Sequence, residues 1–255
     1  MKKRVAFVLF LLLFLVISGE TAHKKTQKNS LPERYAIWLE EEVVYIIAPL
    51  EKEVFLQLRS DRERDLFIQA FWAQRDPTKG DAENEFKKEH FRRISYANHY
   101  FGRATPKAGW RTDRGRLYII LGESNDIVRF EGKSQVYNTE VWFYQGLSTM
   151  GLPPGFNLVF FQQGGAGEYR LYSPLGDGPM ALLTSNFGDQ TDYLSAYRRL
   201  REYEPELADV SLSLIPGEGP SFSGSPSLTS DVLLQRIDTS PARAIKDRYA
   251  QLYMN

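Results

Sequence analysis

The charged residues that are best placed to do chemistry lie in one short stretch, GWRTDRGRLYIILGES, at positions 109–124. Here Asp113 is surrounded in the sequence by Arg111, Arg114 and Arg116. Guanidinium groups around a carboxylate can bind an anion or hold the carboxylate in its ionised form. The stretch is therefore a candidate binding site, and the binding residues that we expect from it and from the following strands are Trp110, Arg111, Asp113, Arg114, Arg116 and Trp142.

The same residue types are also typical of a tight turn, and this is the interpretation that we favour. An aspartate at position 113 can accept hydrogen bonds from backbone N–H groups two residues later. Gly115 can adopt the positive φ that such a turn requires. In this interpretation residues 112–116 lead into a strand, and Trp110 is a buried side chain that anchors a helical layer to a sheet.

A carboxylate pair is the second chemistry to consider. Asp113 and Glu140 could act as acid and base of a hydrolase on an envelope polymer, with Arg114 and Arg116 orienting an anionic group. The chain has 32 acidic residues, so such a pair arises easily by chance. The hydrolase therefore stays an alternative hypothesis beside that of a non-enzymatic binding protein.

Metal, cofactor and thiol chemistry find no support in the sequence. His90 and His99 are nine residues apart, about 180° around one helix, so they cannot share an ion. A hydrogen-bonded core position suits His90, and a solvent-facing one suits His99. The chain has no cysteine, no Walker loop and no dinucleotide-binding fingerprint. We expect no metal site and no cofactor.

The first residues have the layout of a secretory signal. Lys2, Lys3 and Arg4 precede an uncharged apolar run, Val5 to Ile17, and the small residues Ser18 and Gly19 follow. Thirteen residues reach about 20 Å, short of the roughly 30 Å hydrocarbon core of a bilayer. We therefore interpret residues 1–19 as a signal peptide or N-terminal anchor and residues 20–29 as a polar spacer, and we expect an exported protein, in the periplasm or on the outer face of the cytoplasmic membrane.

The overall charge narrows the choice of partners. The 32 basic and 32 acidic residues balance, and loss of the first 19 residues would remove three basic groups and no acidic one. Such a chain has no overall attraction for nucleic acid or anionic lipid. We expect an envelope protein or cell-wall component as partner, membrane contact only through the N-terminal segment, and an oligomeric state that the sequence leaves open.

Helical periodicity dominates the first hundred residues. Capping boxes at Ser30 and Ser60 predict helix starts, and Pro77 predicts the end of the helix that follows Ser60. The predicted helices cover residues 30–38, 49–58, 61–75 and 81–101, with a strand or extended connector at 43–47. A further helix is expected at 191–203, and a last one at 241–253 with Ile245, Tyr249 and Tyr253 on one face.

After Trp110 the period of the apolar residues changes to that of strands. We predict strands at 116–122, 136–144, 156–162 and 168–173, with short connections that favour antiparallel order. Aromatic residues on them (Trp142, Tyr144, Tyr169 and Tyr172) suit a core better than an exposed platform for glycan or peptide. The fold class is α+β: an N-terminal helical layer on a roughly four-stranded antiparallel sheet, with C-terminal helices.

The predicted domain covers residues 30–204. Residues 205–239 are interpreted as a flexible linker because the composition from Ile215 to Leu228 is dominated by Gly, Pro and Ser. Residues 240–255 form a C-terminal helix, which we expect to dock weakly and to be available to a partner.

Five segments resemble the bacterial GWxTD domain, which is found in exported proteins. They are GWRTD at 109–113, FWAQRDPT at 71–78, NEFKKEHFRRISYAN at 84–98, TDRGRLYIILGES at 112–124 and EVWFY at 140–144. The resemblance implies a domain identity over residues from about 30 to 200 and an envelope setting. It implies no activity and supplies no catalytic residues.

Overall fold

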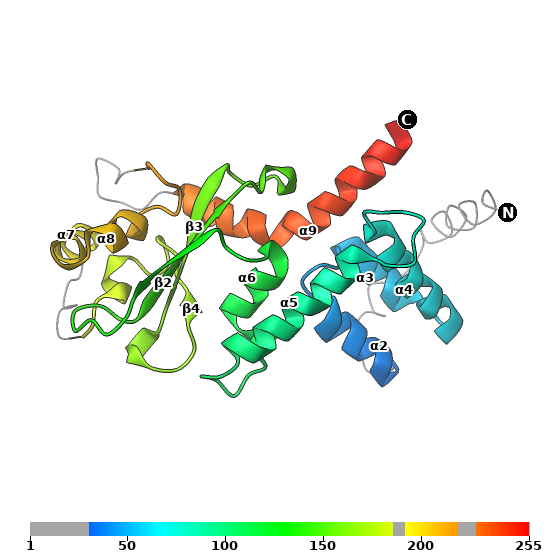
Figure 1. Ribbon diagram of the computed structural model, residues 1–255, viewed down its shortest axis with the longest axis horizontal. Coiled ribbons are helices and arrows are strands. Elements are labelled where there is room, and N and C mark those ends of the chain that lie inside the picture. Colours follow the sequence, from blue (N-terminus) through cyan, green and yellow to red (C-terminus); the bar gives the residue numbers. More distant parts are fainter. Residues whose placement is uncertain (1–30, 186–191, 219–227, 255) are drawn as a thin grey trace, which may run out of the picture.

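The computed structural model describes residues 31–185, 192–218 and 228–254, with side chains of the last helix up to Ala244. Figure 1 shows an elongated molecule with α2, α3 and α4 at one end and α7 and α8 at the other. We call residues 31–84 the helical lobe and residues 109–254 the mixed lobe. The two lobes are joined by α5 (Glu85–Phe101).

The helical lobe has a hydrophobic core of its own. Its elements are α2 (Glu33–Ile37), which continues as a π-helical turn (Trp38–Glu42), α3 (Pro49–Gln57) and α4 (Asp61–Arg75). Trp38 lies at the centre of the core, with its ring 4.7 Å from that of Phe55 and 5.2 Å from that of Phe71. Arg75, the last residue of α4, is buried and pairs with Glu51 of α3 at 2.7 Å. This lobe is therefore a packed unit whose core is separate from that around the sheet.

The mixed lobe is built on a four-stranded antiparallel sheet in the order β1-β2-β3-β4. The strands are β1 (Asp126–Phe130), β2 (Thr139–Gln145), β3 (Gly155–Phe161) and β4 (Arg170–Leu171). The helices α5 and α6 (Asp113–Leu121) pack together, and Phe101 at the end of α5 contacts Trp142 on β2 at 5.6 Å between ring centroids. The α+β class and the antiparallel sheet are confirmed.

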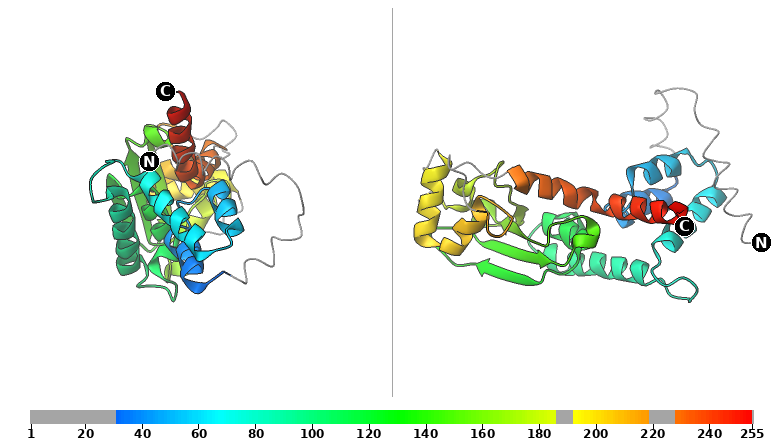
Figure 2. Two further views of the ribbon diagram at one scale, coloured as in Figure 1. Left: turned by 90° about the vertical axis from the view of Figure 1, so that its right-hand side faces the viewer. Right: turned by 90° about the horizontal axis from the view of Figure 1, so that it is seen from above.

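The C-terminal helices complete this lobe. The helices α7 (Tyr193–Tyr203) and α8 (Pro205–Ser211) add Leu200 and Leu207 to the core around the sheet. The last helix, α9 (Leu228–Met254), starts beside the sheet and runs towards the end of the molecule that holds the helical lobe (Figures 1 and 2). Along its course α9 contacts α6, the helix that contains most of the charged stretch at 109–124.

The predicted strand at 116–122 is wrong, because these residues form α6. Thr112 caps the helix by accepting a hydrogen bond from the Gly115 N–H, and Gly122 ends it with φ of +88°. The apolar run from Leu117 to Leu121 is buried throughout. A run that is apolar on every side has no helical period, so its pattern cannot distinguish a helix from a buried strand. The sheet takes its fourth strand from β1, which the sequence pattern did not reveal.

The predicted linker at 205–239 is wrong at both of its ends, and its centre, residues 219–227, lies outside the described residues. Residues 205–211 form α8, and Leu212 and Leu214 are buried. The last helix begins at Leu228, well before the start predicted at residue 240, and Pro241 lies inside the helix. Leu233 and Ile237 are buried in the core of the mixed lobe. The proximal half of α9 is thus a core element, while the face predicted from Ile245, Tyr249 and Tyr253 lies outside the described side chains.

Several other boundaries are confirmed or need small corrections. The capping box of Ser60 and Glu63 is formed, and Ser30 lies outside the described residues. The helix expected from residue 81 begins at Glu85, after an Asn84 cap. Residues 43–47 are a turn and not a strand, with the N–H groups of Ile46 and Ile47 bonded to the Val43 carbonyl. The predicted strands at 136–144, 156–162 and 168–173 correspond to β2, β3 and β4.

His90 occupies the hydrogen-bonded core position expected of it, and its burial makes stability depend on pH. It is 4% exposed, and its Nε2 atom donates to the Glu42 carbonyl at 2.6 Å. Burial lowers the pKa of His90 from 6.5 to about 4. Between these values the unfolded chain binds the proton and the folded chain does not, so stability falls as the pH falls.

We expect His90 to account for a loss of roughly 3 kcal/mol in the free energy of unfolding between pH 6.5 and pH 4. The measurement is urea unfolding across this range for the wild type, His90→Gln and the exposed-histidine control His99→Gln. The control should follow the wild type, and His90→Gln should show the shallower dependence. Parallel curves for all three proteins would contradict this explanation.

Candidate functional site: the GWRTD segment and the cavity beside it

The two glycines of the charged stretch permit close contacts between backbones. A Cβ atom on Gly109 would lie 2.0 Å from the carbonyl oxygen of Ala97 on α5. A Cβ atom on Gly115 would lie 2.0 Å from the carbonyl oxygen of Gly109. Gly115 is helical and has no positive φ, so the conformational reason predicted for it is wrong. Both positions require glycine because no side chain fits between the segments.

Trp110 connects three parts of the molecule. Its backbone N–H donates to Asn98 Oδ1 at 3.1 Å, and its carbonyl accepts from the Tyr45 hydroxyl at 3.2 Å. The residue is 9% exposed and packs in one cluster with Ala97 and Ile119. The tryptophan is buried as predicted. It joins α5, α6 and the helical lobe, however, and does not anchor a helical layer to the sheet.

Thr112 and Asp113 have separate structural roles. The Thr112 hydroxyl donates to the Gly109 carbonyl at 2.7 Å and accepts from the Gly115 N–H at 3.0 Å. Asp113 Oδ2 accepts from the Leu171 N–H on β4 at 2.8 Å. The aspartate therefore fixes α6 to the sheet, and the prediction that it closes its own turn is wrong. A carboxylate used in this way is a positioning group.

The three arginines point to different partners. Arg111 pairs with Glu41 of the helical lobe at 3.0 Å, and Arg114 pairs with Glu140 on β2 at 3.2 Å. Arg116 pairs with Asp238 on α9 and has its Nη2 atom 4.0 Å from Asp113. The stretch does not form one convergent anion site, because the three arginines pair with carboxylates on three different elements.

Glu140 and Trp142 lie inside the mixed lobe. The Glu140 side chain is 8% exposed, and its Oε2 atom accepts from Trp142 Nε1 at 2.9 Å as well as from Arg114. Arg114 also lies over the ring of Tyr169, 4.1 Å from its centroid. A carboxylate that is covered in this way cannot reach a polymer, so the geometry gives the pair of Asp113 and Glu140 no support as acid and base.

The aromatic residues of the strands are core residues. Trp142, Tyr144 and Tyr172 are each at most 2% exposed, and Tyr169 is 8% exposed. Burial raises the pKa of the Tyr169 hydroxyl to about 12. The core interpretation is confirmed, and Trp142 is therefore not available as a binding residue.

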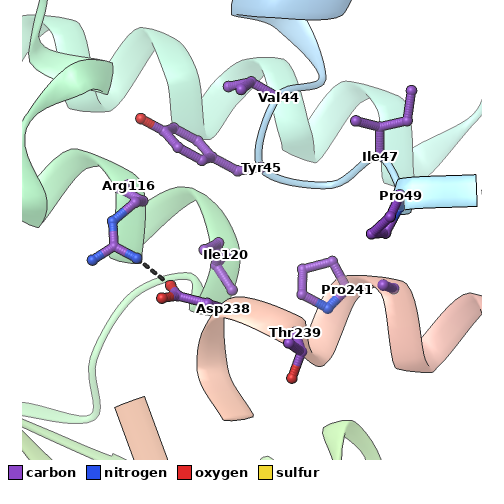
Figure 3. Close-up of a pocket in the computed structure, with 10 residues that line it drawn as sticks. Val44, Tyr45, Ile47, Pro49, Arg116, Ile120, Asp238, Thr239 and Pro241 are labelled. Atoms are coloured by element: carbon purple, nitrogen blue, oxygen red, sulfur yellow. Dashed lines mark hydrogen bonds and ion pairs between the residues drawn. The ribbon is translucent and has the colours of Figure 1, made fainter. Parts of the chain in front are cut away.

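A cavity of about 300 Å³ lies between the helical lobe and the helices α6 and α9 of the mixed lobe (Figure 3). The turn at residues 43–47 and the start of α3 form one wall. The helix α6 forms a second wall, and α9 forms the third, near Pro241. Most of the lining is apolar, and the residues that form it are Val44, Tyr45, Ile47, Pro49, Arg116, Ile120, Asp238, Thr239, Pro241 and Ala242. Clefts between lobes are common positions for ligand sites.

The polar groups of this cavity are Arg116, Asp238, Tyr45 and Thr239. Figure 3 shows the ion pair of Arg116 and Asp238 beside Ile120, with Tyr45 on the opposite wall. Burial raises the pKa of the Tyr45 hydroxyl, and the positive charge of Arg116 opposes this shift. Of the residues predicted to bind, Arg116 is the one that lines the cavity. Its partner on α9 is 122 positions away, and no sequence signal indicated that pairing.

Among the described residues, neither a metal site nor a membrane-spanning helix is present. Within residues 31–185, 192–218 and 228–254, no group of three His, Asp or Glu side chains is placed to hold a metal ion. In the same part of the chain, no helix combines the length and the hydropathy needed to cross a bilayer.

The fold and the site together define a class of protein: a cysteine-free α+β chain in which a GWRTD segment joins two lobes. The model of the GWxTD domain family matches residues 18–163, which is more than half of the chain. The chain therefore belongs to the GWxTD domain family. No curated protein and no solved structure matches it. The matched range ends before Leu171 and Asp238, the partners of Asp113 and Arg116.

Proposed function

We propose that this protein is an exported bacterial envelope protein that acts as a non-enzymatic binding module. Export is supported by Lys2, Lys3 and Arg4 ahead of the apolar run from Val5 to Ile17. We expect the partner to be an envelope protein or a cell-wall component, because the balanced charge of the chain gives no overall attraction for nucleic acid or anionic lipid.

The main support for a non-enzymatic binding role is that the GWRTD pentapeptide at 109–113 makes structural contacts within the protein. Gly109, Trp110, Thr112 and Asp113 are engaged in internal contacts, and Arg111 in an ion pair with Glu41. The segment thereby holds the two lobes together and carries no reactive group. The cavity beside it combines apolar walls with a charged pair, which is the composition of a binding site.

Export is tested with a C-terminal reporter that is active only outside the cytoplasm. We expect activity from the full chain and loss of activity when Leu11→Arg and Leu12→Arg interrupt the apolar run. The matched control is Lys79→Arg, on an exposed loop, which should behave as the wild type. A silent reporter on correctly expressed wild-type protein would contradict export.

Binding at the cavity is tested by photo-crosslinking in intact cells. A photoreactive residue is placed at Thr239 on the cavity rim, and at the exposed Lys79 as control. We expect a discrete adduct from position 239 and none from position 79. The adduct should weaken when Arg116→Met removes the guanidinium. Identical labelling at the two positions would contradict the cavity as the binding site.

A further inference from the structure

Arg116 has hydrogen-bonding capacity that its partners leave unused. Its Nη1 atom bonds to Asp238, and its Nη2 atom is 4.0 Å from Asp113, too far for a hydrogen bond. Within the described residues, its Nη2 and Nε atoms have no hydrogen-bond acceptor. The Oδ2 atom of Asp113 accepts from the Leu171 N–H, and this bond holds the aspartate on the side of the sheet, with its Oδ1 atom towards Arg116. A guanidinium with free donors in a mostly apolar wall is suited to an added oxygen ligand, above all to a carboxylate.

The competing carboxylate, Asp238, is paired with Arg116 but largely exposed to solvent. Its side chain is 53% exposed, whereas that of Arg116 is 23% exposed. Asp238 can therefore turn towards solvent at small cost, while the guanidinium stays in the cavity wall. An incoming carboxylate can use the free donors of Arg116 and take the place of Asp238.

The apolar walls of the cavity indicate which chemical group the ligand must have beside its carboxylate. Val44, Ile47 and Ile120 present aliphatic side chains, and Pro49 and Pro241 present apolar rings. Ala242 is the small residue that leaves space on the α9 side. The volume of about 300 Å³ is at the lower end of the range for ligand pockets. A short aliphatic chain fits these walls better than an aromatic or polar group.

We propose that this cavity binds an aliphatic carboxylate, with the acid group on Arg116 and the chain against Val44, Ile47 and Ile120. The inference rests on the proposed binding function and names the chemical group of the partner that enters the cavity. A free medium-chain acid and the C-terminus of a polypeptide that ends in an aliphatic residue both present this group. Its binding displaces Asp238 and so loosens the contact between α6 and α9.

The test is a titration of the protein as it is recovered after export, in detergent-free buffer, with a series from butyrate to decanoate. A short peptide ending in leucine and the same peptide with an amidated end form the second arm. Calorimetry gives the affinity, and the amide signals of α9 report its loosening. We expect affinity to rise with chain length only until the chain fills the cavity, and the amidated peptide to bind at least about tenfold more weakly than the free acid.

Three variants distinguish the proposal from general hydrophobic binding. Arg116→Met should lower octanoate affinity at least about tenfold. Asp238→Asn should raise it, because the competing carboxylate is gone. Ala242→Leu should abolish binding by filling the cavity without changing any charge. The control Arg103→Gln removes an exposed arginine elsewhere and should bind as the wild type. Thermal unfolding of each variant identifies any that do not fold.

The contradicting results are equally specific. Octylammonium binding as tightly as octanoate would overturn the proposal, and so would an Asp238→Asn variant that binds octanoate more weakly than the wild type. If neither the acids nor the peptide bind while the adduct at Thr239 persists, this inference fails and the proposed function stands. If the adduct is absent as well, both fail.

Discussion

Gly109→Ala should leave the full chain largely unfolded. The added Cβ atom would lie 2.0 Å from the Ala97 carbonyl oxygen and 2.7 Å from the Asn98 Cα, both in the backbone of α5. A flexible side chain could move aside, but a helix backbone in a packed core cannot. We therefore expect a loss of stability greater than the usual ~1–3 kcal/mol of an overpacked core.

The matched control for this substitution is Gly176→Ala. The nearest atom to its added Cβ would be the Ser173 Oγ, at 3.3 Å, and its φ is not positive. Circular dichroism and urea unfolding compare the two variants. The control should stay within about 0.5 kcal/mol of the wild type. A folded Gly109→Ala protein with wild-type stability would show that α5 and the pentapeptide are not in close contact.

Ending the chain at residue 227 should also unfold the mixed lobe, because α9 supplies part of its core. The truncation removes Leu233 and Ile237, each worth roughly 1.5–3 kcal/mol when fully buried. It also removes Ser230, whose hydroxyl accepts from the buried Leu214 N–H at 2.9 Å. The expected loss of about 5 kcal/mol or more is comparable with the total stability of a domain.

A second truncation after Ala244 isolates the contribution of the proximal half of α9. It keeps Leu233, Ile237 and Asp238, and we expect its melting temperature to remain near that of the full chain. Differential scanning calorimetry of both truncated proteins makes the comparison. If the protein that ends at 227 melted like the full chain, α9 would be dispensable for the core, as the predicted linker had implied.

Local signals in the sequence predicted local structure well. The capping box of Ser60 and Glu63 fixes the start of α4 with contacts three residues apart, so it can be recognised without the fold. The start of α9 could not be recognised in this way. Proline is common in the first turn of a helix, so the sequence pattern favours Pro241 as a first-turn residue, although it lies within the helix.

The candidate site was only partly predictable, because its contacts join residues that are distant in the sequence. The sequence identified Arg116 and Asp113 as charged neighbours, but their partners are separated from them by long stretches of chain. Asp238 is 122 positions from Arg116, and Leu171 is 58 positions from Asp113. Spacing within one segment carries no information on such pairs. The walls of the cavity likewise come from three distant segments that only the fold brings together.

The GWRTD segment is the structural joint between the two lobes. Trp110→Ala tests it most directly, because the ring packs with Ala97 and Ile119 and the residue bonds to Tyr45 and Asn98. Urea unfolding should show a loss of about 3–5 kcal/mol, as expected for a large buried aromatic residue. A variant with wild-type stability would contradict this structural role and would make Trp110 an exposed binding residue.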